Sequence, residues 1–222
     1  MTDSEVYSTL QDVLNDDLFP QLDCNLRQGK HIGQEDLTAY SFLEEAFPYL
    51  YKFYRKYSCE LVHDTSEESG FFFLSSYGDM LGKRQLSAAE MIVGMGLAYM
   101  LMDPEYISKR IPSERLVFTL KTLLGEEQYF SRIAPRIRGK NTEGDEQKAE
   151  EEVAKAVRRL GVLGFLTWSR TAEFIIPKSP IFRFISPVRG AGNLESNMKL
   201  LMDKGLLEAD ELGIEGEGDD NV

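Results

Sequence analysis

Apolar residues in the first third of the chain recur at helical spacing before they begin to alternate. Leu37 and Tyr40 lie three positions apart on one face of residues 34–45, which predicts a helix. Residues 47–57 predict a second helix. Pro48 is compatible with it, because a proline is tolerated in the first turn of a helix. After this point the chain changes from a helical to an extended pattern.

Residues 58–75 carry the pattern of a β-hairpin. Residues 58–63 (SCELVH) alternate between apolar and polar side chains, and residues 71–75 (FFFLS) favour a strand. The polar segment between them, residues 64–70 (DTSEESG), predicts the turn. Helices followed by a hairpin are the element order of a winged-helix unit.

The same order of elements recurs in the second half. Residues 87–101 open with a capping box and continue as a strongly apolar helix, and residues 111–124 predict another. Residues 145–160 are the clearest helix, with acids in the first turns and arginines in the last, as the helix dipole favours. Residues 162–168 and 172–177 then predict a second hairpin.

These patterns predict an α+β fold in which helices dominate, arranged as tandem winged-helix domains. We place the first domain at residues 1–78 and the second at residues 79–192. Residues 193–222 add a predicted C-terminal helix, 193–204, and a flexible acidic tail that is too polar to fold alone. The two domains resemble each other in the order of their elements only.

Charge is distributed unevenly over the two halves. The formal net charge is −12. Residues 1–128 carry 21 acids and 11 bases, residues 129–207 carry 9 acids and 14 bases, and residues 208–222 carry 7 acids and no base. The acidic total therefore conceals a basic region in the second half, which is typical of a surface that meets an acidic partner.

The sequence predicts a cytoplasmic protein. Its longest apolar run, residues 91–102, is shorter than the roughly 18 residues of a membrane span, and the polar N-terminus lacks the pattern of a signal peptide. Cys24 and Cys59 are expected to be reduced thiols. Neither cysteine pairs with His31 or His63 at the spacing of a zinc site.

No pattern in the chain indicates catalysis, so we predict a non-catalytic protein without a cofactor or metal. Phosphate-binding glycine loops and nucleophile motifs are missing. Gly94 and Gly96 lie inside an apolar helix, where close helix packing explains them. His31 stands alone, which favours a structural role, and the carboxylates of residues 150–152 are expected to be solvated.

The strongest functional signal is a set of cations around the second hairpin. The helix before the wing of a winged helix enters the DNA groove, and the wing meets the backbone. Cations placed there neutralise phosphates without reading bases. The alternative, a solvated helix whose cations pair with Glu151 and Glu152, stays open. The candidate DNA-binding residues are Lys148, Arg158, Arg159, Lys155, Arg138, Lys140 and Arg170.

Several segments resemble a known family. The segment from Leu18 to Gly33, LFP followed by LRQGKHIG, is similar to that of the MukE family, accessory subunits of bacterial MukBEF-type condensins. The order and spacing of the similar segments extend over residues 17–190. The chain departs from the family in a shorter N-terminus and in residues 77–130, so the divergent MksE branch also stays open. The other similar segments are Phe42-Leu43, residues 53–57, 70–74, 147–148, 158–161 and 182–184.

The resemblance implies partners that the patterns alone do not. Members of this family are tandem winged-helix homodimers. They bind a kleisin, the MukF-like subunit, and through it an SMC ATPase, the MukB-like subunit, in chromosome condensation and segregation at the nucleoid. Lys148, Arg158 and Arg159 match basic positions of the family, so the resemblance implies DNA contact there in the assembled complex. The alternative function is a free-standing winged-helix transcription regulator.

Overall fold

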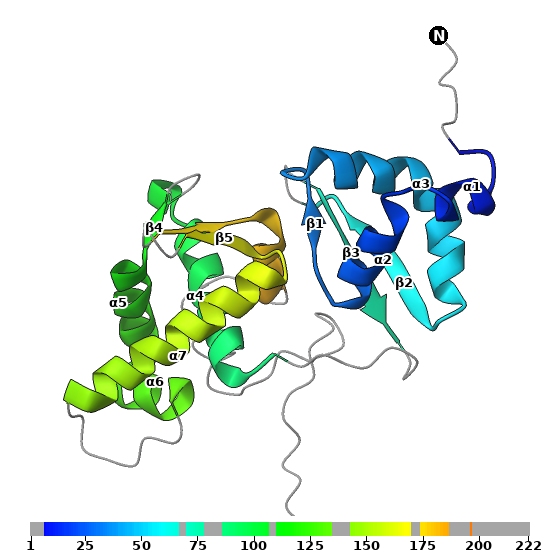
Figure 1. The fold of residues 1–222 in the computed structure, drawn as a ribbon. Coiled ribbons are helices and arrows are strands. Elements are labelled where there is room, and N and C mark those ends of the chain that lie inside the picture. Colours follow the sequence, from blue (N-terminus) through cyan, green and yellow to red (C-terminus); the bar gives the residue numbers. More distant parts are fainter. Residues whose placement is uncertain are drawn as a thin grey trace, which may run out of the picture. The chain divides into compact units, whose positions relative to one another are not determined.

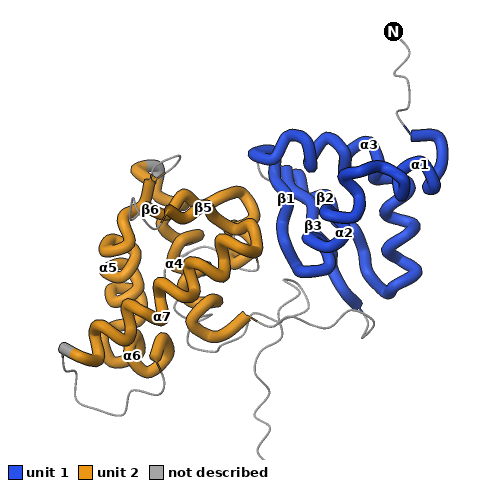
Figure 2. The backbone as a smooth tube through the Cα atoms, viewed as in Figure 1, with its two compact units in different colours: residues 1–84 blue, residues 85–222 orange. Residues whose placement is uncertain are grey.

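The computed structural model divides the chain into two compact units, residues 1–84 and 85–222 (Figures 1 and 2). The predicted boundary between residues 78 and 79 lies outside the described residues. The predicted C-terminal segment, 193–222, lies outside them as well, apart from Ser196. The described residues are 7–66, 70–77, 86–106, 110–134, 143–169, 174–186 and 196.

The first unit combines helices with one small antiparallel sheet. The sheet order is β1-β3-β2, so the first strand of the unit pairs with the last strand of the hairpin. Phe72 in β3 lies opposite Ile32 in β1 and opposite His63 in β2. Figure 1 shows these elements in colours from blue through cyan to the teal-green of β3. They are α1 (Leu10–Leu14), α2 (Phe19–Arg27), β1 (Ile32–Gly33), α3 (Leu37–Arg55), β2 (Cys59–Asp64) and β3 (Phe71–Ser76).

The two helices predicted for residues 34–57 are one continuous helix, α3, so the predicted break was wrong. Ala46, Leu50 and Tyr54 are buried and continue one stripe through the predicted break. Packing of that stripe outweighs the hydrogen bond that a proline removes from a helix interior. Pro48 itself is exposed, so water can solvate the carbonyl group left without a partner.

A buried tyrosine ties α2 to the end of α3. The hydroxyl of Tyr54 donates a hydrogen bond to Asp23 Oδ1 at 2.9 Å, and Arg27 Nε donates to the same carboxylate at 2.7 Å. Burial and the charge of Asp23 raise the pKa of the Tyr54 hydroxyl well above its usual value. The guanidinium carbon of Arg27 also lies 4.7 Å from the ring centroid of Tyr57. Polar and aromatic contacts therefore join two helices that are close in sequence.

The second unit repeats the sheet arrangement with more helices. Its sheet order is β4-β6-β5, again antiparallel throughout. The predicted helix at residues 111–124 begins with the two-residue strand β4 and becomes helical only at Ser113. The elements are α4 (Ala88–Leu101), η1 (Pro104–Tyr106), β4 (Ile111–Pro112), α5 (Ser113–Leu124), α6 (Glu126–Ile133), α7 (Glu143–Val162), β5 (Leu166–Ser169), β6 (Phe174–Pro177) and η2 (Ser179–Phe184).

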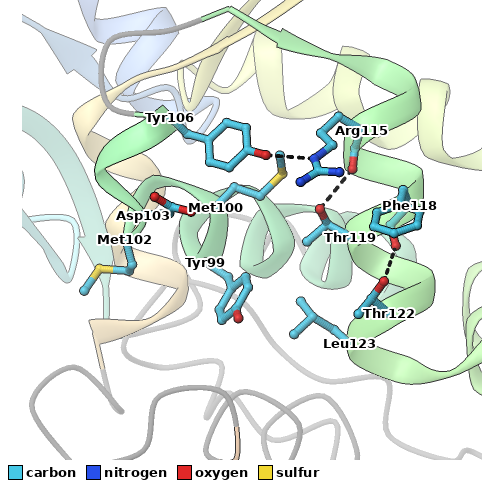
Figure 3. Close-up of a pocket in the computed structure, with 10 residues that line it drawn as sticks. All are labelled: Tyr99, Met100, Met102, Asp103, Tyr106, Arg115, Phe118, Thr119, Thr122 and Leu123. Atoms are coloured by element: carbon cyan, nitrogen blue, oxygen red, sulfur yellow. Dashed lines mark hydrogen bonds between the residues drawn. The ribbon is translucent and has the colours of Figure 1, made fainter.

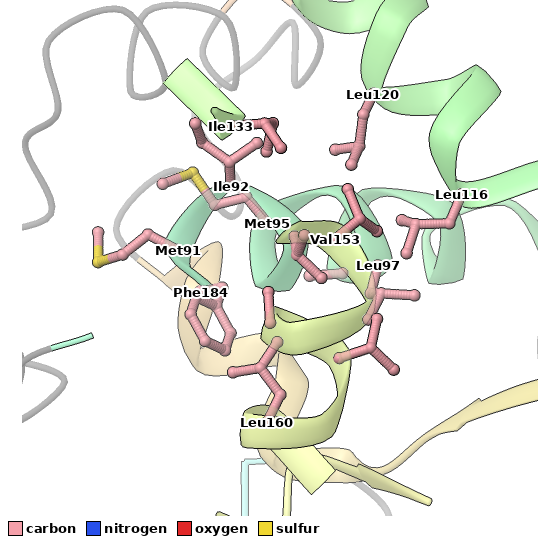
Figure 4. Close-up of a cluster of buried hydrophobic side chains, with 14 of the residues drawn as sticks. Met91, Ile92, Met95, Leu97, Leu116, Leu120, Ile133, Val153, Leu160 and Phe184 are labelled. Carbon is pink, nitrogen blue, oxygen red and sulfur yellow. The ribbon is translucent and has the colours of Figure 1, made fainter. Parts of the chain in front are cut away.

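Helix α4 is the centre of the second unit, as its apolar sequence predicts. The predicted capping box is present: the Ser87 hydroxyl accepts from Glu90 N, and the Glu90 carboxylate accepts from Ser87 N. The predicted close packing of Gly94 and Gly96 is confirmed. A Cβ at position 94 would lie 2.5 Å from ring atoms of Phe184, and one at position 96 would meet the Leu120 side chain. Figure 4 shows Phe184 against this helix.

Mixed helix and sheet, with helices dominant, is therefore the fold class of the described residues, as predicted. The second hairpin is present, with β5 beginning at Leu166 rather than at the predicted residue 162 and with β6 ending at Pro177 as predicted. Helix α7 runs through Gly161, where we expected it to stop, and the chain turns at Gly164 with a φ of 82°. That left-handed conformation suits glycine.

Replacing Gly94 with alanine will destabilise the second unit. The added methyl group collides with the Phe184 ring, which can move only with its neighbours, and overpacking of this kind costs about 1–3 kcal/mol. Gly96→Ala is the matched control, since the same helix-propensity gain is opposed by the flexible end of Leu120. Urea unfolding will show a lower midpoint for Gly94→Ala than for Gly96→Ala. Equal midpoints contradict the close approach.

Tyr129 is a second fully buried tyrosine, and unlike Tyr54 its hydroxyl has no hydrogen-bond partner among the described residues. Burial, followed by the charges of Glu150 and Glu146, raises the pKa of this hydroxyl to about 12. A buried hydroxyl without a partner opposes folding, because it has lost its water.

Two Tyr→Phe variants will therefore differ in their effect on the free energy of unfolding. Tyr54→Phe removes a hydrogen bond to a charged acceptor and lowers the free energy of unfolding by about 1.5–3 kcal/mol. Tyr129→Phe removes an unsatisfied group and leaves that free energy unchanged or higher. Thermal unfolding followed by circular dichroism measures both. A loss in Tyr129→Phe as large as that in Tyr54→Phe would show that the Tyr129 hydroxyl is paired.

Candidate functional site

Four of the seven candidate DNA-binding residues lie together on α7. Lys148, Lys155 and Arg159 are separated by seven and four residues, so they share one face of the helix. Lys148, Lys155 and Arg158 are exposed and Arg159 is half-buried. The remaining candidates, Arg138, Lys140 and Arg170, lie outside the described residues.

The buried stripe of α7 points these cations away from the core. Ala149, Val153, Ala156 and Leu160 are buried, and they repeat every three or four residues along the helix. Packing of this stripe against α4 and its neighbours fixes the rotation of α7. Arg158 then lies opposite the stripe, and Lys148, Lys155 and Arg159 lie along one flank of it, where Lys148 and Lys155 are exposed.

One of these cations is paired within the helix and the others have different surroundings. Lys155 Nζ lies 2.6 Å from Glu152 Oε1, a surface pair of the kind that contributes about 0–1 kcal/mol. Arg158 Nε donates to the carbonyl oxygen of Ala154, and its guanidinium carbon lies 5.9 Å from the Trp168 ring. Lys148, Arg158 and Arg159 form no ion pair with the residues that the structure describes. Among the described residues, the solvated-pair alternative therefore applies to Lys155 only.

A groove that the sequence patterns did not indicate lies along the outer side of α5. It has a volume of about 530 Å³ and is bordered by the end of α4, by η1 and by α5 (Figure 3). We call it the α4–α5 groove. Residues of α5 that line it recur at helical spacing, and the groove is lined by Tyr99, Met100, Met102, Asp103, Tyr106, Arg115, Phe118, Thr119, Thr122 and Leu123.

The polar side chains of the α4–α5 groove bond mainly to their own neighbours. Arg115 Nε donates to the Tyr106 hydroxyl at 2.7 Å. The hydroxyls of Thr119 and Thr122 each donate at 2.9 Å to backbone carbonyls of α5. Figure 3 shows these bonds as dashed lines. Exposed apolar surface is therefore the main feature that the groove offers to a partner.

A smaller pocket of about 230 Å³ lies between α5, α7 and β5. Its apolar lining includes Val117, Val157 and the half-buried Trp168, and two of its other lining residues are Glu114 and Glu150. It stands next to the cations of α7, since Arg158 contacts the same tryptophan ring.

The residues considered for metal binding or catalysis have structural surroundings. His31 is buried and stacks on Phe73, and His63 accepts or donates a 2.8 Å hydrogen bond with Tyr40. Cys24 is exposed, Cys59 is buried, and both are free thiols. Within the part of the chain that the structure describes, no three His, Cys, Asp or Glu side chains gather as a metal site.

In the described segments no helix is both long enough and apolar enough to cross a bilayer.

Comparison with known proteins identifies the family. The model of the MukE-like family matches residues 6–218, nearly the whole chain. The chain belongs to the MukE-like family. The resemblance seen in residues 17–190 is thereby confirmed, and the match also spans residues 77–130, where the chain departs most from the family pattern.

Curated relatives from several bacteria agree with this assignment to the MukE-like family. "Chromosome partition protein MukE" of Histophilus somni is 36% identical over 193 residues, which cover 84% of this chain and 76% of the relative. The proteins of the same name from Vibrio cholerae and Pectobacterium atrosepticum are 34% and 31% identical. The Vibrio match covers 84% of this chain and 80% of the relative, and the Pectobacterium match covers 96% and 92%.

Proposed function

We propose that this chain is a non-catalytic accessory subunit of a bacterial MukBEF-like condensin. In this role it dimerises, binds the MukF-like kleisin and, through the kleisin, joins the MukB-like ATPase in chromosome organisation and partition. It works in the cytoplasm at the nucleoid. The match of the MukE-like family model to residues 6–218 carries the proposal. The names of the relatives, which all describe chromosome partition proteins, support it.

Each unit is proposed to be a winged helix. In both units a two-residue strand follows the first helices, β1 after α2 and β4 after η1, and it pairs with the last strand of the hairpin that follows α3 in one unit and α7 in the other. The sheet orders β1-β3-β2 and β4-β6-β5 are equivalent, because in each unit the third strand along the chain lies between the first and the second. This arrangement supports the proposal. The short edge strand pairs with the central strand of the sheet and so attaches the hairpin, which would be the wing, to the rest of the unit.

The exposed face of α7 is proposed to contact the DNA backbone within the complex. Lys148, Lys155, Arg158 and Arg159 lie on the helix directly before the hairpin, and Arg138, Lys140 and Arg170 flank it in sequence. Glu151 and Glu152 reduce the net positive charge of this face. The face therefore suits phosphate contact in an assembly that supplies further cations, rather than tight binding by the isolated chain.

A free-standing transcription regulator is the alternative function. It would require the isolated chain to bind a defined duplex, yet residues 1–128 carry a net charge of −10. An acidic first half repels DNA at low salt. A footprint of the isolated protein at one operator would favour this alternative.

The proposed role predicts a stable complex with a kleisin. Co-expression with the kleisin-like protein of the same genome will give a complex that survives size-exclusion chromatography, because accessory subunits of this kind bind the kleisin directly. Light scattering of the peak will show two copies of this chain per assembly unit. Separate elution of the two proteins at every concentration contradicts the proposal.

Charge reversal on α7 will weaken DNA binding by the assembled complex. Arg158→Glu with Arg159→Glu removes two phosphate contacts, so the affinity falls about ten-fold or more. The slope of the logarithm of the binding constant against the logarithm of the salt concentration becomes shallower by about two. Fluorescence anisotropy with a labelled duplex at several salt concentrations measures both quantities.

A matched variant separates local contact from total charge. Lys52→Glu with Lys56→Glu changes the net charge by the same amount at exposed positions of the first unit. We expect nearly unchanged DNA affinity in this control and intact kleisin binding in both variants. Equal losses of DNA affinity in the two variants would refute a specific role for α7.

A further inference from the structure

The α4–α5 groove has the composition of a protein-binding surface. Methionine, aromatic residues and arginine are enriched in the buried centres of interfaces, and tyrosine and arginine among the residues that dominate binding. The groove contains all of these types. Phe118 is 59% exposed and Met102 is 40% exposed, so two large apolar side chains of this surface stand in water. Met100 and Leu123 are buried and lie beneath them as part of the core.

Arg115 gives the α4–α5 groove a charge preference. It is the one cation among the described residues that line the groove, and its guanidinium carbon lies 5.2 Å from the Phe118 ring and 6.0 Å from the Tyr106 ring. With Nε held by the Tyr106 hydroxyl, the planar group is oriented before any partner arrives. An arginine fixed in this way suits a carboxylate, because its donors match the two carboxylate oxygens.

The acidic side chain of the groove, Asp103, forms no ion pair with Arg115 in the described part of the chain. Asp103 Oδ1 accepts a 2.9 Å hydrogen bond from the backbone N–H of Glu105, which stabilises the start of η1. That carboxylate therefore has a local structural role. The outer side of α5 presents Arg115, Phe118 and Thr122 at spacings of three and four residues, which forms a continuous stripe of cation, ring and methyl-bearing side chain.

We propose that the α4–α5 groove is a docking site for a linear segment of the kleisin-like partner. The segment places an Asp or Glu carboxylate on Arg115 and lays apolar side chains over Phe118 and Met102. This inference rests on the proposed function, which supplies the partner, and adds the residues and the chemistry of the contact. The carboxylate sets the register of the segment, and the apolar contacts supply most of the buried surface.

Two other exposed apolar side chains and the smaller pocket, all in the described part of the chain, offer less to such a segment. Leu37 and Tyr77 are exposed large side chains of the first unit, but neither lines the α4–α5 groove or the smaller pocket. The smaller pocket beside Trp168 has less than half the volume and carries Glu114 and Glu150, which repel an acidic segment. Charge and size together therefore favour the α4–α5 groove.

Two single substitutions in the full-length chain test the site. Arg115→Glu reverses the charge that meets the carboxylate, and Phe118→Ser removes the exposed ring. Each will weaken binding of the kleisin-like protein at least ten-fold in isothermal titration calorimetry, and Arg115→Lys, which lacks the planar fork, will lose less. Both positions are exposed, so the variants are expected to keep their circular dichroism spectra and melting temperatures.

Matched variants in the first unit provide the control. Arg55→Glu and Leu37→Ser make the same chemical changes at exposed positions outside the groove, and we expect unchanged kleisin affinity. If the wild-type chain binds the kleisin-like protein and all four variants bind equally well, the groove assignment is wrong while the proposed function stands. If the wild-type chain does not bind at all, the proposed function fails.

Photo-crosslinking identifies the occupant. With p-benzoylphenylalanine in place of Phe118, irradiation of the reconstituted complex will join the groove to the kleisin-like protein. Mass spectrometry will place the adduct within a few residues of an Asp or Glu. An adduct only with a second copy of this chain, with its own C-terminal residues or with DNA overturns the proposal, as does a kleisin segment without a nearby carboxylate.

Discussion

The second unit depends on how closely other elements approach α4. This helix is buried on nearly every side, so other elements pack around it and it has no polar face of its own that meets water. Gly94 lets the ring of Phe184 reach the helix backbone, and Gly96 does the same for Leu120 of α5. Helix α7 packs on another side of the same helix. The positions of α5 and α7, and with them every surface discussed for this unit, follow from that packing.

Helices with strong local signals were predictable from sequence, and non-local contacts were not. The capping box of α4 and the charge gradient of α7 act within a few residues, so the pattern alone locates both helices. The two-residue strands β1 and β4 have no period to detect and exist only through pairing with distant hairpins. The break expected in α3 was wrong because the packing of Ala46, Leu50 and Tyr54 against the rest of the unit outweighs the hydrogen bond that one proline removes.

Candidate interaction residues divide in a similar way. The cations of α7 were found from charge, and helical spacing indicated a pair with Glu151 or Glu152, yet the sequence could not show that Arg158 contacts the Trp168 ring. The α4–α5 groove gave no signal, because its lining comes from the end of one helix, a short 3₁₀ turn and the outer side of another helix. Its arginine, aromatic and threonine residues follow neither an apolar nor a charged pattern. Only the folded arrangement brings them to one surface.

The pairing of each short strand with a late hairpin has a consequence for how the chain folds. Strand β4 meets β6 only after α5, α6, α7 and the hairpin turn have been traversed, and β1 meets β3 across α3. Closing a loop of this length costs entropy that the two-residue strand recovers only when the enclosed helices are already packed. The hairpins β2–β3 and β5–β6 are local and can form early. Addition of β1 and β4 is then a late step that couples all elements of a unit, so each unit should lose its sheet and its helices in one cooperative transition.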